Sequence, residues 1–313
     1  MSYSLVVFDW DGTLMDSTHS IVAAIQGACR DLELAVPSAS DASWVIGLSL
    51  ESALRRAVPE LTQAMLPRFL ERYRTHYLLR DPELRLFDGV RELLTELAAI
   101  WHDYRSRVWR TPVVRRLRER RFRTADYLNW MENWIPQVRE GSKWMREGAA
   151  SLSGQYAPLA ALIDTHAGEE QNDFQILFND YRKAGGAIED IDALRRNPGG
   201  EALNAYLHGL AATRDPIGLL GAIYIIEGTG QRIVPALLPL LKASLALPPD
   251  AFRFLEYHGH NDEHHLARWL SAVELALDCD EDGRAGQRIV DTARRTAALY
   301  LMQFHHVMED DAS

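Results

Sequence analysis

Cysteine is scarce in this sequence, which has only Cys29 and Cys279 among its 313 residues. Two cysteines so far apart support neither a disulfide framework nor a cysteine-based zinc site, so we expect a reducing compartment. No apolar run approaches the roughly 20 residues that a transmembrane helix needs. The N-terminus also lacks the pattern of a secretion signal, because Asp9 and Asp11 interrupt its short apolar run. We therefore predict a cytoplasmic protein without a membrane partner.

Positive net charge is also lacking, since the formal net charge is -10 at pH 7. This balance argues against nucleic acid as the main partner. Residues 105–123 are an exception, with nine arginines and a single acid, Glu119. Such a stretch binds an anion or forms the solvated face of an amphipathic helix, and we favour the second interpretation. The length and ordinary globular composition fit two domains.

Strand-like segments are few. The apolar run 5–8 predicts one buried strand, and from Ser17 onward apolar residues recur at helical spacing. The apolar segment 219–226 is predicted to be a buried helix. Breaks at 185–186, 197–200, 247–250 (where Asp250 can cap the next helix) and 279–283 predict about seven or eight helices after residue 100. The fold class is therefore mainly α, with a domain boundary between residues 99 and 100.

A specific motif follows the predicted strand. Asp9 and Asp11 stand two residues apart in the sequence Asp-Trp-Asp-Gly-Thr, where both carboxylates can reach one site. With its flanking residues this motif resembles the opening of haloacid-dehalogenase superfamily phosphatases, particularly those similar to phosphoglycolate phosphatase. The resemblance continues through helices at 17–80 and into 86–94. It implies a helical cap, Asp9 as nucleophile, Asp11 as acid/base and Mg²⁺ as the cofactor.

That resemblance is incomplete, because nothing after Ala99 supplies the further strands, the lysine or the later acidic pair of the family. We predict a partial α/β segment over 1–99, with one strand plus a helical cap, that is catalytically silent or serves in docking. A lone strand exposes its edge, so a second copy, as in a homodimer, or another partner is expected to cover it. A phosphatase remains the alternative function.

A histidine-rich segment carries the densest chemistry in the C-terminal part. His258, Asp262 and His265 stand at i, i+4 and i+7, so they share one face of a helix. Two imidazoles and one carboxylate form a ligand type that suits non-heme iron. The alternative is a solvent-exposed helix. Apolar residues such as Leu255 and Trp269 give this helix a buried side, which favours the metal site.

Two further acidic pieces accompany it. Glu227 ends the apolar segment 219–226, where a carboxylate must be paired, bound to metal or turned toward water. Glycines within 228–230 allow a neighbouring backbone or a substrate to approach closely. Glu170 and Asp173, at i and i+3, offer two carboxylates on one face, although alone they fit an acidic surface turn equally well.

Together these pieces resemble the heme-oxygenase-like fold over residues 101–307, specifically its diiron oxidase and oxygenase branch. The family usually carries Glu-x2-His on the earlier helix, and here Asp173 stands at the histidine position after Glu170. For the glutamate of the first helix we choose Glu140, with Glu132 as the alternative. The metal ligands that the resemblance implies are Glu140, Glu170, Asp173, Glu227, His258, Asp262 and His265.

The resemblance implies one or two iron ions that bind O₂ and oxidise a small organic substrate. Heme is not expected, because His102 is the only histidine near the first helix and lies at the joint. The tryptophans at 130, 134 and 144 either line a substrate pocket or pack in the core, and we favour the core. A helical metal-binding module without enzymatic activity is the remaining alternative.

Overall fold

The computed structural model describes residues 18–43, 50–79, 90–260 and 262–308. Within these ranges, the side chains of Leu50, Ser52, Val90, His260 and residues 262–267 are outside the description. The described elements are helices, and none of them is a strand. The predicted strand at 5–8, with Asp9 and Asp11, lies outside the described residues. The chain divides into two compact units, residues 3–91 and 92–313.

The first unit contains four helices where the sequence predicts a helical cap. They are α1 (Thr18–Asp31), α2 (Ala39–Ser43), α3 (Leu50–Ala57) and α4 (Leu66–Leu78). Their apolar faces meet in a small core in which Ile25, Leu54 and Phe69 are almost fully buried. An ion pair of 2.9 Å between His76 on α4 and Asp31 on α1 joins the two longest of these helices.

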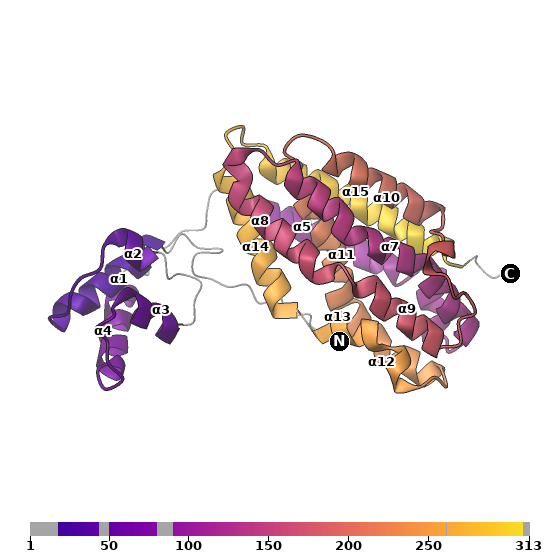
Figure 1. Ribbon diagram of the computed structural model, residues 1–313, viewed down its shortest axis with the longest axis horizontal. Coiled ribbons are helices and arrows are strands. Elements are labelled where there is room, and N and C mark those ends of the chain that lie inside the picture. Colours follow the sequence, from indigo (N-terminus) through magenta and orange to yellow (C-terminus); the bar gives the residue numbers. More distant parts are fainter. Residues whose placement is uncertain (1–17, 44–49, 80–89, 261, 309–313) are drawn as a thin grey trace. The chain divides into compact units, whose positions relative to one another are not determined.

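The second unit is a helical bundle, shown in Figure 1. Its α-helices are α5 (Val90–Val108), α6 (Pro112–Arg118), α7 (Thr124–Ala150), α8 (Ala157–Glu170), α9 (Asp173–Lys183), α10 (Pro198–Ala211), α11 (Leu219–Arg232), α12 (Val234–Ser244), α13 (Arg253–His260), α14 (Asp262–Asp278) and α15 (Ala285–His306). Helix α5 therefore runs through the boundary predicted at 99/100. No helix in the described ranges is long and apolar enough to span a bilayer.

Helix α11 is packed within the bundle rather than on its surface. It lies against α15, while α10 packs on both α15 and α7, and α7 packs in turn on α8 and α9. A Cβ added at Gly221 would stand 2.0 Å from the carbonyl oxygen of Ile289, so only glycine permits this approach of α11 to α15. The prediction of a buried helix at 219–226 is confirmed.

The helices end near the predicted breaks, and side-chain caps are visible at some of these ends. Asn197 caps α10, with its side-chain oxygen accepting the N–H of Gly200 at 2.9 Å. The prediction that Asp250 caps the next helix is wrong for α13. The N–H of Phe254, in the first turn of α13, donates instead to the carboxylate of Asp180 on α9, at 2.8 Å. In the described part of the chain, the helices after residue 100 outnumber the prediction in part because α8 and α9 are separate elements.

The arginine-rich stretch forms the end of α5, the short helix α6 and the turn that follows. On α6, Val113, Val114 and Leu117 are buried, whereas Arg115 and Arg118 are exposed. This is the amphipathic arrangement that the sequence favours.

Candidate metal centre

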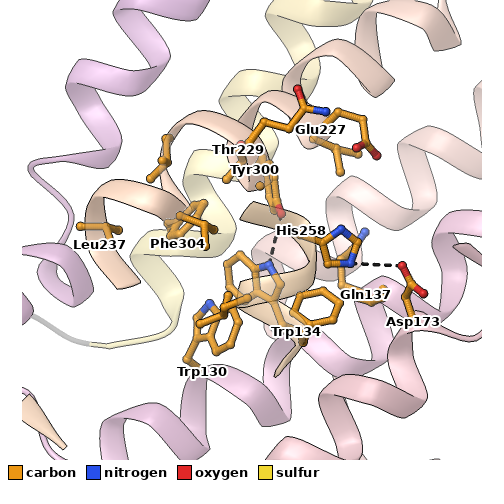
Figure 2. Close-up of a pocket in the computed structure, with 18 of the residues that line it drawn as sticks. Trp130, Trp134, Gln137, Asp173, Glu227, Thr229, Leu237, His258, Tyr300 and Phe304 are labelled. Atoms are coloured by element: carbon orange, nitrogen blue, oxygen red, sulfur yellow. Dashed lines mark hydrogen bonds and ion pairs between the residues drawn. The ribbon is translucent and has the colours of Figure 1, made fainter. Parts of the chain in front are cut away.

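Four helices bring carboxylates and imidazoles to one cavity of the second unit. Helix α8 ends at Glu170, α9 begins at Asp173, α11 carries Glu227 in its second half and α13 carries His258. Glu170, Asp173, Glu227 and His258 all line this cavity. Figure 2 shows Asp173, Glu227 and His258 around it. Residues that are far apart in the sequence therefore meet at one place because of the way the bundle packs.

The polar atoms are close enough to share cations. Nε2 of His166, on α8, lies 3.4 Å from Oε1 of Glu170 and 3.5 Å from Oε1 of Glu227. Nε2 of His258 lies 3.1 Å from Oδ2 of Asp173. Two groups, His166/Glu170/Glu227 and Glu170/Asp173/His258, each offer ligand atoms within 4.8 Å of one another. Glu170 belongs to both groups.

The charge balance of this cluster shows in its pKa values. Burial by itself lowers the pKa of His166, but the carboxylates of Glu170 and Glu227 outweigh it and raise that pKa to about 10. Burial also opposes the charged form of His258, yet Asp173, Glu170 and Glu227 raise its pKa above the ordinary value. The pKa of Glu170 is raised by burial and by repulsion from Glu227. Protons thus supply the positive charge that three buried carboxylates need.

The donor set fits a divalent cation. Oε1 of Glu170 and Nε2 of His258 are buried and make no hydrogen bond. The 3.1 Å between His258 and Asp173 is an ion-pair distance, without the alignment of a hydrogen bond. The two atoms thus have ion-pair contacts, with His166 and Asp173 respectively, but no hydrogen bond. Buried polar atoms without a hydrogen bond are uncommon in folded proteins and call for an explanation such as a bound ion. Imidazole nitrogens with carboxylate oxygens form a set that Fe²⁺ and related metals accept.

Local packing fixes the position of His258. The N–H of Phe254, one turn before His258 on α13, donates to the buried carboxylate of Asp180 on α9. The phenyl ring of Phe254 lies 4.3 Å from the imidazole, centroid to centroid. A Cβ added at Gly230 would lie 3.6 Å from Cβ of His258, in ordinary contact, so α11 and α13 approach closely here. A Cβ at Gly228 would stand 2.9 Å from the indole of Trp101. At Gly228 the close neighbour is therefore a side chain, that of Trp101, and not the backbone or substrate that the sequence predicts.

Away from the polar cluster the cavity is apolar. Its wall includes Val114 and Leu117 of α6 with Leu237 and Leu241 of α12. The volume of the cavity is about 190 Å³. Because a cavity of roughly 150 Å³ already holds benzene, this one has room for a small organic molecule. Trp130, Trp134 and Trp144 also line it. Trp134 and Trp144 are buried core residues as well as cavity wall, whereas Trp130 is half-buried.

Two buried tyrosines stand at the same wall or directly behind it. The indole N–H of Trp134 donates to the hydroxyl of Tyr300 at 3.2 Å. Burial raises the pKa of Tyr300 to about 12. The hydroxyl of Tyr104 pairs with that of Thr229 at 3.0 Å. Tyr300, which lines the cavity, therefore keeps its proton at neutral pH.

The structure brings together only part of the predicted ligand set. Glu140 lies outside the cluster: it accepts a hydrogen bond from Lys143 at 2.8 Å and pairs with His208 of α10 at 3.3 Å. The alternative, Glu132, accepts a hydrogen bond from Tyr181 at 2.8 Å. Asp262 and His265 fall within α14, but their side chains are outside the description. His258 belongs to α13, and residue 261, between this helix and α14, is outside the described residues, so the predicted shared face of His258, Asp262 and His265 stays a prediction.

Two residues of the site were missed in the sequence. His166 stands four residues before Glu170 on α8, and this His-x3-Glu spacing was a usable signal. Gln137 lines the cavity from α7, is 7% exposed, and its carboxamide oxygen makes no hydrogen bond. Its signal was the helical spacing Trp130, Trp134, Gln137, Gly141, which marks the face of α7 that lines the cavity.

Comparison with known proteins gives one family for the N-terminal part of the chain and another for the helical part. The sequence model of the family described as haloacid dehalogenase-like hydrolase matches residues 6–103. This part is 33% identical over 98 residues to tyrosine-protein kinase PtkA of Mycobacterium tuberculosis, which is 31% of this chain and 32% of that protein. It is 30% identical over 99 residues to phosphoglycolate phosphatase of Agrobacterium fabrum, 30% of this chain and 42% of the relative. The chain thus spans well under half of these curated relatives.

The helical part resembles different proteins. Residues 165–301 match the sequence model of the family described as iron-containing redox enzyme. A domain of unknown function with a heme oxygenase-like fold from Shewanella denitrificans matches with a TM-score of 0.59 and 21% identity, covering 70% of this chain and 91% of that one. A TenA homolog from Pseudomonas syringae matches with a TM-score of 0.58 and 12% identity, covering 69% and 92%. The second unit therefore has a heme oxygenase-like fold.

Proposed function

We propose that the helical domain binds one or two non-heme iron ions at the cavity cluster and uses O₂ to oxidise a small apolar organic substrate. The observation that carries this proposal is the convergence of Glu170, Asp173, Glu227 and two histidines on one cavity, with ligand atoms within 4.8 Å in each group. The match of residues 165–301 to an iron-containing redox family supports the same metal.

The resemblance adds two ligands to the set. Asp262 and His265 follow His258 at the spacing of the family's helix, and we include them as ligands on that ground. In the set as a whole, imidazole nitrogens and carboxylate oxygens leave positions open for O₂. Iron, when bound, supplies the redox chemistry, which no side chain of the cluster can perform.

The protein's own contribution is positioning and the exclusion of water. Asp180 holds α13, and with it His258, against α9. The apolar wall built by α6 and α12 gives an organic substrate a dry binding surface next to the cluster. Tyr300 holds a proton at the cavity wall, fixed by the N–H of Trp134, where it can be donated to a substrate oxygen.

The test is anaerobic loading with Fe²⁺, followed by O₂ addition with simultaneous optical spectra and an oxygen electrode. We expect O₂ uptake proportional to bound iron, with a visible absorption change that His258→Ala abolishes. An iron-loaded protein that consumes no O₂ above the rate of free Fe²⁺ would refute the oxidase proposal while leaving metal binding intact.

For the N-terminal segment we propose that it is catalytically silent, since the family's later motifs have no counterpart after Ala99. Its 30% identity to a phosphoglycolate phosphatase keeps the alternative open to experiment. Mg²⁺-dependent hydrolysis of p-nitrophenyl phosphate that disappears in Asp9→Asn would establish the phosphatase reading instead.

A further inference from the structure

Gln137 is the most conspicuous polar residue of the cavity that the proposed function does not use. It is 7% exposed, and its carboxamide oxygen is buried without a hydrogen-bond partner. A buried amide oxygen left unpaired costs about 1–3 kcal/mol. An apolar residue of similar volume would avoid that cost, so its presence in an otherwise apolar stretch of wall points to a ligand.

The position of Gln137 narrows the choice of ligand. It lines the same cavity as Asp173 and His258, from a helix that packs directly on α8 and α9. Figure 2 shows Gln137 pointing into the cavity beneath the imidazole of His258, on the side of Asp173. Among the described lining residues, the charged ones are Glu170, Asp173, Glu227 and His258. An amide oxygen beside carboxylates cannot accept a proton from them when they are ionised, but it can share a cation with them.

We infer that the carboxamide oxygen of Gln137 is a neutral ligand that completes the metal position formed by Glu170, Asp173 and His258. This inference rests on the proposed function. Among the described residues, each of the two groups has one imidazole and two carboxylates, so the amide gives this position one uncharged oxygen donor more than the other. Oxygen donors of this kind suit Mn²⁺ and Fe²⁺. The two positions then differ in donor number, and only this one should respond to a change at Gln137.

The experiment titrates the full-length metal-free protein with Mn²⁺, with free Mn²⁺ followed by electron paramagnetic resonance, and repeats the titration anaerobically with Fe²⁺. In the wild type we expect two binding steps. Gln137→Glu, which adds a charge without changing size, should tighten one of the two steps by at least about tenfold. Gln137→Met, which keeps the volume and removes the oxygen, should weaken the same step and leave the other unchanged.

The matched control is Asn133→Asp, which makes the same amide-to-acid change one turn earlier on α7. Asn133 donates to the backbone oxygen of Asn129 at 2.8 Å and does not line the cavity. This variant should leave both steps unchanged. Circular dichroism and thermal melts of each variant show whether α7 still folds.

The outcomes separate the inference from the function it rests on. If metal binds in two steps and neither Gln137 variant alters either of them, the amide is not a ligand and the inference is wrong while the proposed function stands. If Gln137→Glu and Asn133→Asp act equally, the effect is general electrostatics and the inference is again wrong. If the wild type binds neither Mn²⁺ nor Fe²⁺, both fail together.

Discussion

The Nε2 atom of His258 lies 3.1 Å from Oδ2 of Asp173, across the interface between α13 and α9. The pair is buried, and the pKa of His258 is raised chiefly by Asp173 and Glu170, against the opposing effect of burial. In the metal-free cluster, the protons on His166 and His258 therefore supply the positive charge that a bound cation would otherwise supply.

Metal binding should release protons. A divalent ion must displace the protons from His166 and His258, so affinity for Zn²⁺ or Mn²⁺ should rise as pH increases from 6 to 8. Isothermal titration calorimetry at one pH, in buffers with different ionisation enthalpies, gives the number of protons released. An affinity that does not change with pH, with no proton release, would contradict the assignment of these histidines as ligands.

His166→Ala should remove a large part of the metal affinity, on the order of 10- to 100-fold, because it deletes the only imidazole of one ligand group. His208→Ala is the matched control. His208 also pairs with carboxylates, 2.8 Å from Glu147 and 3.3 Å from Glu140, but on α10 and away from the cluster. Equal loss of metal in both variants, measured by elemental analysis after dialysis, would show that the effect is not specific to the cluster.

The metal-free protein should lose stability as pH rises. The folded-state pKa of His166 is about 10, above the ordinary 6.5, because Glu170 and Glu227 outweigh burial. Its contribution is thus fully present below pH 6.5 and is lost as pH rises toward 10. We expect the melting temperature of the metal-free protein to fall by at least about 3 °C between pH 6.5 and 9, which corresponds to about 1 kcal/mol.

That fall should be smaller in His166→Gln, which cannot carry the charge, and smaller in the metal-loaded wild type, where the ion replaces the proton. Differential scanning fluorimetry across this range measures all three. An identical slope in the metal-free wild type and in His166→Gln would mean that another group controls the pH dependence.

The packing of α11 on α15 should tolerate no side chain at Gly221. A Cβ there would stand 2.0 Å from the carbonyl oxygen of Ile289, in rigid backbone. Gly221→Ala should therefore destabilise the helical domain by about 2 kcal/mol or more, as overpacking of a core does. Gly209→Ala, on α10 with nothing within 4 Å of its added Cβ, should instead stabilise it by about 0.5–1 kcal/mol. Urea unfolding of the two variants decides between them.

The sequence predicts much of the fold because its helices carry clear periodicity and end signals. The buried helix at 219–226 and the break at 197–200, where Asn197 caps α10, follow from local patterns that the structure keeps. The capping of α13 was not predictable, because its acceptor, Asp180, comes from another helix 74 residues away in sequence. Long-range partners of this kind leave no trace in local spacing.

The candidate site was also only partly predictable. Glu227 was chosen because it ends an apolar segment, and Glu170, Asp173 and His258 were chosen by helical spacing and by the family resemblance; the structure brings all four to one cavity. Glu140 was chosen on α7 for the glutamate that the resemblance implies, but it pairs with Lys143 and His208. The polar residue of α7 in the cavity is the uncharged Gln137. A search for acidic ligands passes over an uncharged amide, even though the spacing of the tryptophans marks its face of the helix.

The central claim is that the cavity cluster binds iron, and iron content after anaerobic Fe²⁺ loading and desalting tests it most directly. The comparison is between wild type, Glu170→Gln and Glu140→Gln, the same isosteric change at the shared ligand of both groups and at a glutamate outside them. We predict one to two irons per chain in wild type and in Glu140→Gln, and loss of nearly all iron in Glu170→Gln. Iron retained in Glu170→Gln, or absent from the wild type, would contradict the account.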